Sequence, residues 1–375
     1  MKIGLVVQSG VELGGAHNYE ANFHDMAQKV AKNLGYELVL FVPDKFKAEA
    51  KRPAQLFRYR SSPARFVLAH MRANPITLSI FRLIGLGMTN LERQAVKQGI
   101  DVLIFASPNH LSPGVHGIPM VTTAWDFGHL DLPHYPETGL GGLWKWREEL
   151  YSTTAARSVL MFCDSQSTTQ RLVSRYGVDS NRVREIGLLP SVPENVTPEQ
   201  LDKPHFIYPA MFWAHKDHFL LLESFSDFIK ANGEIAYLVL TGKGPLFKNV
   251  QSYAKELGIS QSVQFLGLVP RARLMSLIAG SRGLLMASIL GPSNIPPLES
   301  ALLGVPVVAS DVHKMTDMLS GLKVVPSSNR KAWATAISDL WSNKVAAPKV
   351  IPLGEEATLT EAIEFLALQI RGTSR

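Results

Sequence analysis

A single carboxylate stands near the start of an apolar helix in the stretch SNIPPLESALLGVPVVASD, which runs from Ser293 to Asp311. Asn294 is a helix-capping residue type, and the two prolines after Ile295 suit a first helical turn, where a missing N–H is not needed. A helix that begins this way directs backbone N–H groups and its positive dipole end toward an anion. We therefore expect Ser293, Asn294 and Ile295 at a phosphate. Glu299 would then accept hydrogen bonds from sugar or ribose hydroxyls, unless it only complements the helix dipole as a first-turn acid.

A lysine follows the first expected strand of the second half of the chain. The stretch YPAMFWAHKDHFLLLESF reads as a strand, a loop and a helix, and Lys216 lies where the loop becomes the helix. A lysine at such a junction can neutralise a leaving diphosphate as a compact point charge. The alternative is an ordinary surface lysine at a helix start.

Adjacent glycines, Gly14 and Gly15, follow the first expected strand of the chain, KIGLVVQ. Glycines let the backbone approach a ligand closely, and the N-terminus of the helix that follows favours an anion. We expect this turn to face a phosphate, although a plain strand-to-helix connection would have the same sequence.

A cluster of acids and histidines follows another strand, in TTAWDFGHLDLPHYPE, and it contains Asp126, His129, Asp131, His134 and Glu137. The spacing matches no familiar zinc motif, so we expect no metal site here. Loops at strand ends more often carry catalytic groups. Asp126 and His129 are therefore the candidate site residues of the first half.

Short apolar runs alternate with amphipathic helical stretches, such as 18–34, 91–98 and 219–231, along the whole chain. This alternation predicts an α/β protein with parallel sheets and right-handed crossovers. The strand candidates are 2–8, 37–42, 101–107, 119–125 and 158–165 in the first half and 205–210, 236–242, 262–267, 283–288 and 305–310 in the second.

The segment 189–204, LPSVPENVTPEQLDKP, is rich in proline and polar residues and has no periodicity. It therefore reads as a linker between two Rossmann-like domains, whose ligands usually bind outside the carboxyl ends of the strands. We expect a first domain over 1–195, a second domain over 196–350, and a C-terminal helix in 351–375 that crosses back to the first domain.

The composition excludes several protein classes. With 375 residues and 46% hydrophobic content, two ordinary domains are expected and disorder is not. A single cysteine, Cys163, excludes a disulfide framework and fits a reducing compartment; its apolar neighbours predict a buried strand position. No signal-peptide cleavage site follows the N-terminal apolar run, and Arg82 interrupts the longest later one. We expect a cytoplasmic protein without a membrane span.

Between Asp44 and Lys97 there are eleven Lys and Arg residues and three acids, an excess of eight positive charges, whereas the whole chain carries +6. Large apolar residues are interleaved with the basic ones. The mixture suits an anionic membrane surface or a polyanionic acceptor, or else a merely solvated basic face. No nucleic-acid recognition motif accompanies the charge. We expect headgroup contacts from the arginines of this stretch, Arg58, Arg60, Arg65 and Arg72.

The Ser293–Asp311 block resembles the donor-site motif of family-4 glycosyltransferases of the GT-B type, in the branch that builds bacterial polysaccharides and lipopolysaccharides. In that motif two glutamates flank a loop that contains Gly and Pro. Glu299 matches the second glutamate, and the first falls on Gly291. TGKGP resembles the Gly-x-Gly-Pro turn of the same family, and the Lys216 loop resembles its phosphate-binding segment without the usual arginine.

The resemblance implies that 1–195 is the acceptor-side domain and that 196–350 is the nucleotide-sugar-binding domain. It also implies roles for other positions. The loop with Gly14 and Gly15 would face the donor diphosphate, and the FLG-to-VPR segment, including Val269, would lie at the nucleobase. The histidine of the family's His-Asp pair falls on Trp125, so His129 would substitute for it beside Asp126.

The resemblance implies a GT-B fold and a retaining hexosyltransferase-type enzyme. It would move a sugar from a nucleotide-diphosphate donor to a glycan or lipid-linked oligosaccharide, without a cofactor or metal. The basic stretch from Asp44 to Lys97 adds the expectation that the protein works at the inner face of the membrane. The departing phosphate oxygen can itself take the acceptor proton, so no protein nucleophile is required. The alternatives are a GT-B nucleotide-sugar epimerase or hydrolase, and a non-catalytic nucleotide-sugar-binding protein.

Overall fold

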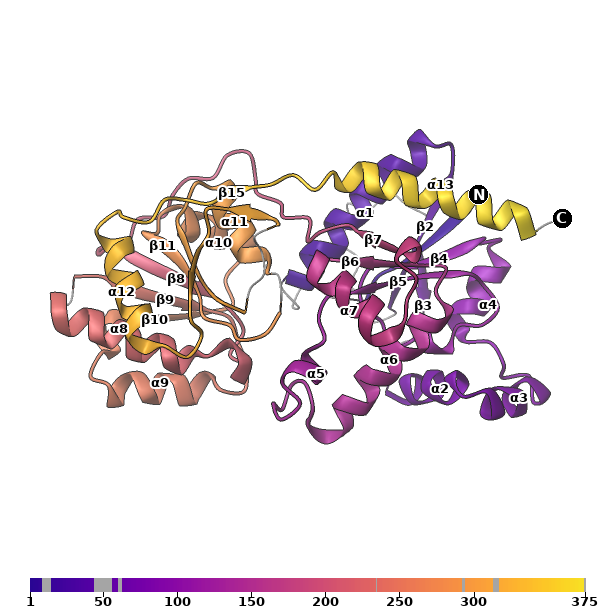
Figure 1. Ribbon diagram of the computed structural model, residues 1–375, viewed down its shortest axis with the longest axis horizontal. Coiled ribbons are helices and arrows are strands. Elements are labelled where there is room, and N and C mark those ends of the chain that lie inside the picture. Colours follow the sequence, from indigo (N-terminus) through magenta and orange to yellow (C-terminus); the bar gives the residue numbers. More distant parts are fainter. Residues whose placement is uncertain are drawn as a thin grey trace. The chain divides into compact units, whose positions relative to one another are not determined.

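The computed structural model describes residues 1–8, 15–43, 56–59, 63–233, 235–291, 294–312 and 317–373. The chain divides into two compact units (Figure 1). The first unit comprises Met1–Asp126, Trp144–Leu189 and Leu353–Arg375, and the second comprises Phe127–Leu143 and Pro190–Pro352. Each unit contains a parallel sheet covered by helices, so the expected pair of Rossmann-like α/β domains is confirmed.

A seven-stranded parallel sheet forms the centre of the first unit, in the order β3-β2-β1-β4-β5-β6-β7. Helices cover it because parallel strands are buried on both faces. The strands are β1 (Lys2–Val6), β2 (Glu37–Pro43), β3 (Leu56–Tyr59), β4 (Val102–Phe105), β5 (Met120–Ala124), β6 (Leu160–Cys163) and β7 (Val183–Glu185). The helices are α1 (Gly15–Asn33), α2 (Pro63–Ala73), α3 (Pro75–Leu83), α4 (Asn90–Lys97), α6 (Leu143–Arg157), α7 (Gln166–Tyr176) and α13 (Glu355–Thr373).

The second unit has a six-stranded parallel sheet in the order β10-β9-β8-β11-β12-β14 and a separate antiparallel pair, β13-β15. The strands are β8 (His205–Pro209), β9 (Tyr237–Thr241), β10 (Val263–Gly267), β11 (Gly283–Met286), β12 (Val307–Ser310), β13 (Leu319–Ser320), β14 (Lys323–Val325) and β15 (Lys349–Val350). The helices are α5 (Gly128–Asp131), α8 (His218–Asn232), α9 (Phe247–Glu256), α10 (Arg271–Ala279), α11 (Ile295–Leu302) and α12 (Arg330–Trp341).

Both sheets reverse their strand order at one point. In the first unit the reversal lies between β1 and β4, and in the second it lies between β8 and β11. Loops that leave neighbouring strands at such a point turn to opposite faces of the sheet and leave a crevice at the carboxyl ends. In the second unit the described parts of those loops are 210–217, 287–291 and Asn294.

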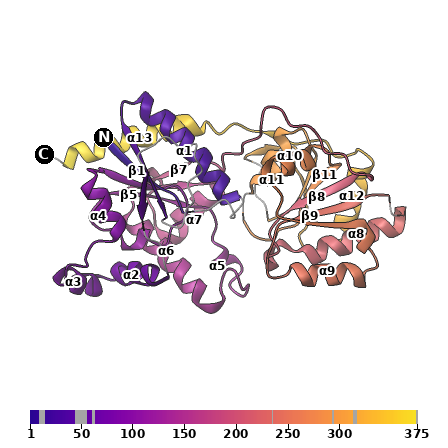
Figure 2. The ribbon, with the colours of Figure 1, turned by 180° about the vertical axis from the view of Figure 1, so that it is seen from behind.

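The C-terminal helix α13 belongs to the first unit, where it packs along α1 (Figures 1 and 2). Leu359 and Ile363 are buried, and the Arg184 guanidinium lies 5.7 Å from the centre of the Phe365 ring. The first unit is therefore built from three separate stretches of the chain.

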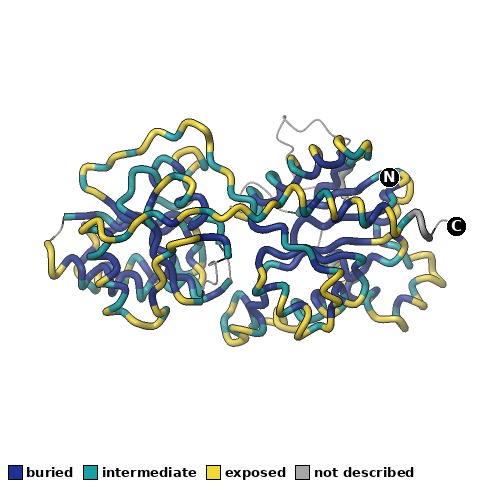
Figure 3. The backbone as a smooth tube through the Cα atoms, turned by 45° about the horizontal axis from the view of Figure 1, so that its top comes forward, coloured by how far each residue is buried: buried dark blue, intermediate teal, exposed yellow. Residues whose placement is uncertain are grey.

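Every strand expected from the sequence is present, and most are apolar runs that become buried (Figure 3). The exception is β10, which is buried only at Val263. Cys163 is a buried residue of β6, as predicted, and residues 190–200 contain no helix or strand. The strands that the sequence did not indicate are β3, β7, β13, β14 and β15, which are short and contain charged or polar residues. No helix in the described part of the chain is long and apolar enough to cross a bilayer.

His218 is a buried histidine at the start of α8, 4.3 Å from the Phe212 ring and 4.9 Å from the Tyr208 ring between centroids. Burial, and then the nearby Lys216, lower the pKa of His218 from 6.5 to about 3. Between these two pH values His218 is protonated in the unfolded chain and neutral in the folded chain. Stability contributed by the neutral ring is therefore present above pH 6.5 and is lost as the pH falls.

We expect acid to destabilise the wild type more than the variant His218→Phe. The difference should grow by about 1 kcal/mol per pH unit below the pKa of an exposed histidine. Urea unfolding at neutral pH and at mildly acidic pH measures it. Equal losses of unfolding free energy in both proteins would show that another group is responsible.

Candidate active site

The reversal point of the second sheet brings the predicted residues Lys216 and Asn294 together. β8 and β11 are parallel neighbours, so the loops after them leave the same edge of the sheet. Lys216 lies in the loop after β8, and Asn294 and Ser288 lie in the loop after β11. Lys216 Nζ donates to Asn294 Oδ1 at 3.3 Å and to Ser288 Oγ at 3.3 Å. A cation is thus held at the start of α11, where the helix dipole favours an anion.

Asn294 is the N-cap residue of α11, in an extended conformation with φ −148° and ψ 141°. Its side chain accepts no hydrogen bond from the helix, so the expected capping contact is wrong. The Asn294 amide oxygen accepts from Lys216 instead. Ile295 is the first residue of α11, prolines occupy the first turn as predicted, and Ser293 lies outside the described residues.

Glu299 is buried in α11 and lies beyond the first turn, which contains no acid. The interpretation of Glu299 as a first-turn acid is therefore wrong. Arg271 Nη2, at the start of α10, donates to Glu299 Oε1 at 2.7 Å. Burial raises the pKa of the Glu299 carboxyl above its ordinary value, and the Arg271 guanidinium opposes this rise. Sequence reasoning did not find Arg271, although its VPRAR segment was assigned to the nucleobase.

The loop that carries Lys216 is tied down by Glu137. The Glu137 carboxylate accepts hydrogen bonds from His215 N at 2.8 Å and from His215 Nδ1 at 2.6 Å. Burial raises the pKa of Glu137, but the backbone and side-chain hydrogen bonds outweigh it and hold the pKa below its ordinary value. The His215 carbonyl in turn accepts from Ile289 N at 2.8 Å, and Tyr208 Oη donates to the Lys216 carbonyl at 2.7 Å. Glu137 therefore acts as a positioning residue for the Lys216 loop.

The TGKGP turn after β9 packs directly against this loop. A Cβ atom on Gly244 would lie 2.6 Å from the Phe212 carbonyl oxygen, too close for any side chain. Phe212 N donates to the Lys243 carbonyl at 2.9 Å, and Leu246 N donates to the Phe212 carbonyl at 3.2 Å. Glycine is required at position 244 so that the TGKGP turn can come close enough to the loop after β8 to form these backbone hydrogen bonds.

Gly291, where the resembled motif has its first glutamate, has φ +94°. This backbone conformation suits glycine and strains any residue with a side chain. A glutamate would therefore require a different loop path. Val269 is half-buried in the loop between β10 and α10, two residues before Arg271.

At the reversal point of the first unit, Gly15 begins α1, and Gly14 lies outside the described residues. The buried Glu20 of α1 accepts from Gln8 N at 3.1 Å and from the Ser107 hydroxyl. This acid, which the sequence did not single out, links the loops after β1 and β4.

Asp126 and His129 fall in different units of the chain. Asp126 forms an ion pair with Arg147 of α6. Burial lowers the pKa of Arg147, but the Asp126 carboxylate, together with Tyr151 and Tyr176, raises it above its ordinary value. His129 is a fully buried residue of α5. The described residues contain no cluster of His, Cys, Asp or Glu that could hold a metal ion.

The structure describes only part of the basic stretch between Asp44 and Lys97. The basic residues outside the described part are Lys45, Lys47, Lys51, Arg52 and Arg60, together with the side chains of Arg58 and Arg65. Arg72 is buried, and its Nε donates to the Leu86 carbonyl at 2.9 Å. The expectation that Arg72 meets headgroups is therefore wrong.

Two family models match the chain. Residues 19–187 match Glycosyltransferase Family 4, and residues 194–357 match Glycosyl transferases group 1. Each model covers less than half of the chain, and together they span most of it. The chain has the GT-B fold of two Rossmann-like domains. No curated protein sequence matches this GT-B chain significantly.

Solved structures resemble this GT-B chain along almost its full length. HepE of Anabaena in complex with UDP is 14% identical, with a TM-score of 0.65 and coverage of 100% of this chain and 99% of HepE. The apo form of WaaB, a lipopolysaccharide outer core galactosyltransferase, is 16% identical, with a TM-score of 0.62 and coverage of 92% and 91%. TarM of S. aureus in a complex that contains UDP is 10% identical, with a TM-score of 0.67 and coverage of 98% and 99%. Such identities show a shared fold.

The variant Glu137→Gln tests the support of the Lys216 loop. The amide removes the negative charge, so the protein should lose roughly 1–3 kcal/mol of stability and should bind a nucleoside diphosphate more weakly. Thermal unfolding with and without nucleotide measures both effects. Glu223, which accepts from Tyr253 at 2.6 Å on the α8–α9 surface, is the control. Glu223→Gln should change stability alone, and an equal loss of nucleotide affinity in both variants would contradict a positioning role for Glu137.

Proposed function

We propose that this protein transfers a sugar from a nucleotide-diphosphate donor to a hydroxyl of a glycan or lipid-linked glycan, with retention of the anomeric configuration. One observation carries the proposal: Lys216 is held at the start of α11, at the reversal point of the second sheet. A cation and a helix N-terminus at that point suit a donor diphosphate. The structural similarity to HepE, whose solved complexes contain UDP and UDP-glucose, supports a nucleotide-sugar donor.

In the proposed reaction, the bond between the anomeric carbon and the diphosphate oxygen breaks while the acceptor oxygen bonds to the same carbon. The acceptor proton passes to the departing phosphate oxygen. Lys216 and the α11 N-terminus stabilise the negative charge that develops on the diphosphate, which is the main electrostatic contribution. We propose that no metal ion or other cofactor takes part, because Lys216 supplies the positive charge.

Glu299 is the proposed hydroxyl-binding residue of the donor site. Its buried carboxylate is fixed by Arg271 at 2.7 Å, and it follows the phosphate end of α11 by about one turn. A fixed acceptor group beside a phosphate site suits a ribose or sugar hydroxyl. Asp126 of the first unit, held by Arg147, and His129 of the second unit remain the proposed acceptor-side residues.

We also propose that the acceptor is presented at the inner, anionic face of a membrane. The excess of positive charge between Asp44 and Lys97, interleaved with large apolar residues, supports this part of the proposal.

Donor turnover with and without acceptor glycans separates this function from its alternatives. A thermal-shift series with UDP, GDP, ADP, CMP and TDP first identifies the nucleotide, since a ligand of the folded state raises the melting temperature. Release of nucleotide that depends on an acceptor supports transfer. Conversion of donor without any acceptor indicates an epimerase or hydrolase, and binding without conversion indicates a non-catalytic protein.

The variant Lys216→Ala should fold normally and lose nucleoside-diphosphate affinity and turnover. Loss of one member of a desolvated charge pair costs roughly 2–5 kcal/mol. Calorimetric titration and initial rates measure the loss. The matched control is Lys255→Ala, which removes an exposed lysine of α9. Kinetics of Lys216→Ala that match those of Lys255→Ala would remove Lys216 from the site.

The variant Glu299→Gln should keep its melting temperature within a few degrees and lose roughly 10- to 100-fold in turnover, because a charged acceptor of hydrogen bonds becomes a neutral amide. Full activity in this variant would show that Glu299 serves only to hold Arg271.

A further inference from the structure

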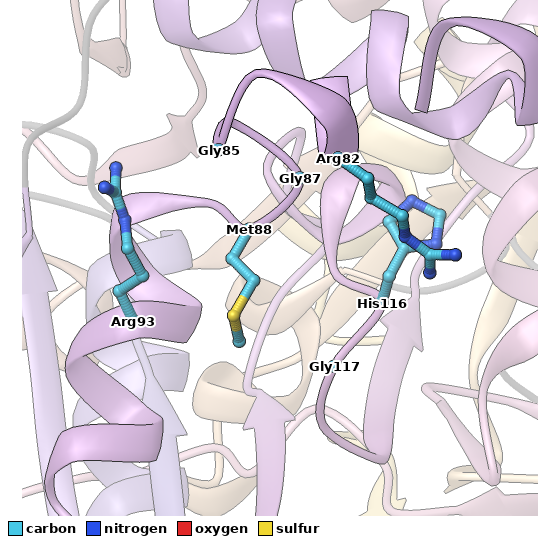
Figure 4. Close-up of a pocket in the computed structure, with 7 residues that line it drawn as sticks. All are labelled: Arg82, Gly85, Gly87, Met88, Arg93, His116 and Gly117. Carbon is cyan, nitrogen blue, oxygen red and sulfur yellow. The ribbon is translucent and has the colours of Figure 1, made fainter. Parts of the chain in front are cut away.

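A pocket of about 290 Å³ opens in the first unit, beside the loop that precedes β5. It is formed by the end of α3, the loop 85–88, the start of α4 and the loop before β5 (Figure 4). Arg82 lies beside the His116 ring on one side, and Arg93 extends from α4 on the other, with Met88 between them (Figure 4).

The pocket is positively charged. Arg82 and Arg93 are both exposed, and neither forms an ion pair with any residue that the structure describes. The neighbouring acid Glu92 is fully buried and saturated with backbone donors: Thr89 N at 2.6 Å, His116 N at 2.6 Å and Gly117 N at 2.9 Å. Glu92 therefore shapes the pocket without offering a carboxylate to its opening.

The walls of the pocket are held in place before any ligand binds. The buried Arg72 donates from Nε to the Leu86 carbonyl at 2.9 Å, which fixes the loop after α3. His116 Nε2 lies 2.7 Å from the Arg72 carbonyl, so this nitrogen carries the proton and donates. Burial, and then Arg157, lower the pKa of His116, so the positive charge at the pocket comes from the two exposed arginines.

An apolar surface adjoins the pocket. Ile76, Ile80 and Leu83 lie on one face of α3, one turn apart, and they are 73%, 52% and 87% exposed. Ile84, which follows the helix, is 61% exposed. Figures 1 and 2 both place α3 at the edge of the first unit, next to α2 and far from α13. Large exposed apolar residues grouped in this way mark a binding surface.

We propose that this pocket binds the phosphate headgroup of an anionic phospholipid while the apolar face of α3 enters the hydrocarbon boundary. The positive charge of the two arginines attracts a phosphate. The apolar face of α3 beside them favours a phosphate that is attached to a lipid over a free anion. A helix with an apolar face and flanking arginines lies in the interface plane in this manner. The inference rests on the proposed membrane-surface acceptor and names the residues that make the contact.

The test is sedimentation of the full chain with phosphatidylcholine vesicles, with and without phosphatidylglycerol. The wild type should bind the vesicles that contain phosphatidylglycerol, and binding should weaken as salt increases. Each of Arg82→Gln and Arg93→Gln should weaken binding roughly fivefold, and the double variant about thirtyfold. The matched control is Lys248→Gln with Lys255→Gln, which removes the same charge from α9 of the second unit and should leave binding unchanged.

The apolar contact has its own variants, Ile80→Ser and Leu83→Ser. Both side chains are exposed, so the variants should fold, and they should reduce vesicle binding at high salt, where the arginines are screened. Unchanged binding in these variants, or equal weakening by the α9 control, would overturn the proposal.

Two further outcomes would assign the pocket to another ligand. Inorganic phosphate that raises the melting temperature as much as vesicles do would indicate a site for a soluble anion. Self-association that Leu83→Ser abolishes, without vesicle binding, would indicate a contact between copies of the chain. Turnover with a soluble acceptor separates this inference from the proposed function. The Arg82 and Arg93 variants should keep the turnover of the wild type. If the proposed function is wrong, the wild type will also show no turnover.

Discussion

The parallel pairing of β8 with β11 is the constraint on which the candidate site depends. Because the two strands run the same way, their loops leave one edge of the sheet, and because the strand order reverses between them, the loops part and leave room for a ligand. Lys216 comes from one loop and Asn294 from the other. Their hydrogen bond at 3.3 Å places a positive charge in front of a helix N-terminus.

The surrounding contacts keep that charge in place. Glu137 binds the backbone and the ring of His215, the residue before Lys216, and Gly244 lets the TGKGP turn reach the backbone of Phe212. Arg271 fixes the buried Glu299 one turn into α11. Each of these contacts restrains a donor or acceptor before a ligand arrives, and such preorganisation is the source of most electrostatic catalysis.

Local sequence patterns predicted the long apolar strands, the start of α11 and the position of Lys216 between a strand and a helix, because each depends on residues that are neighbours in the chain. The pairs Glu137–His215 and Arg271–Glu299 were missed because their members are 78 and 28 residues apart, and no local pattern marks an ion pair between distant loops. The sequence also did not show which charged residues are buried. Arg72 was expected at the surface, but it is buried and donates to the Leu86 carbonyl in the loop after α3. Composition alone likewise gave no sign that Phe127–Leu143 would join the second unit.

The central claim is that the start of α11, with Lys216, is a diphosphate site. Calorimetric titration of the wild-type chain with a nucleoside diphosphate, the corresponding monophosphate and the nucleoside tests this claim most directly, with the base chosen from the nucleotide that raises the melting temperature most. The account predicts that affinity falls steeply at each loss of a phosphate, because the charge that Lys216 and the helix dipole neutralise is removed. Equal affinities for all three would show that the base and ribose supply the binding energy and would contradict the account.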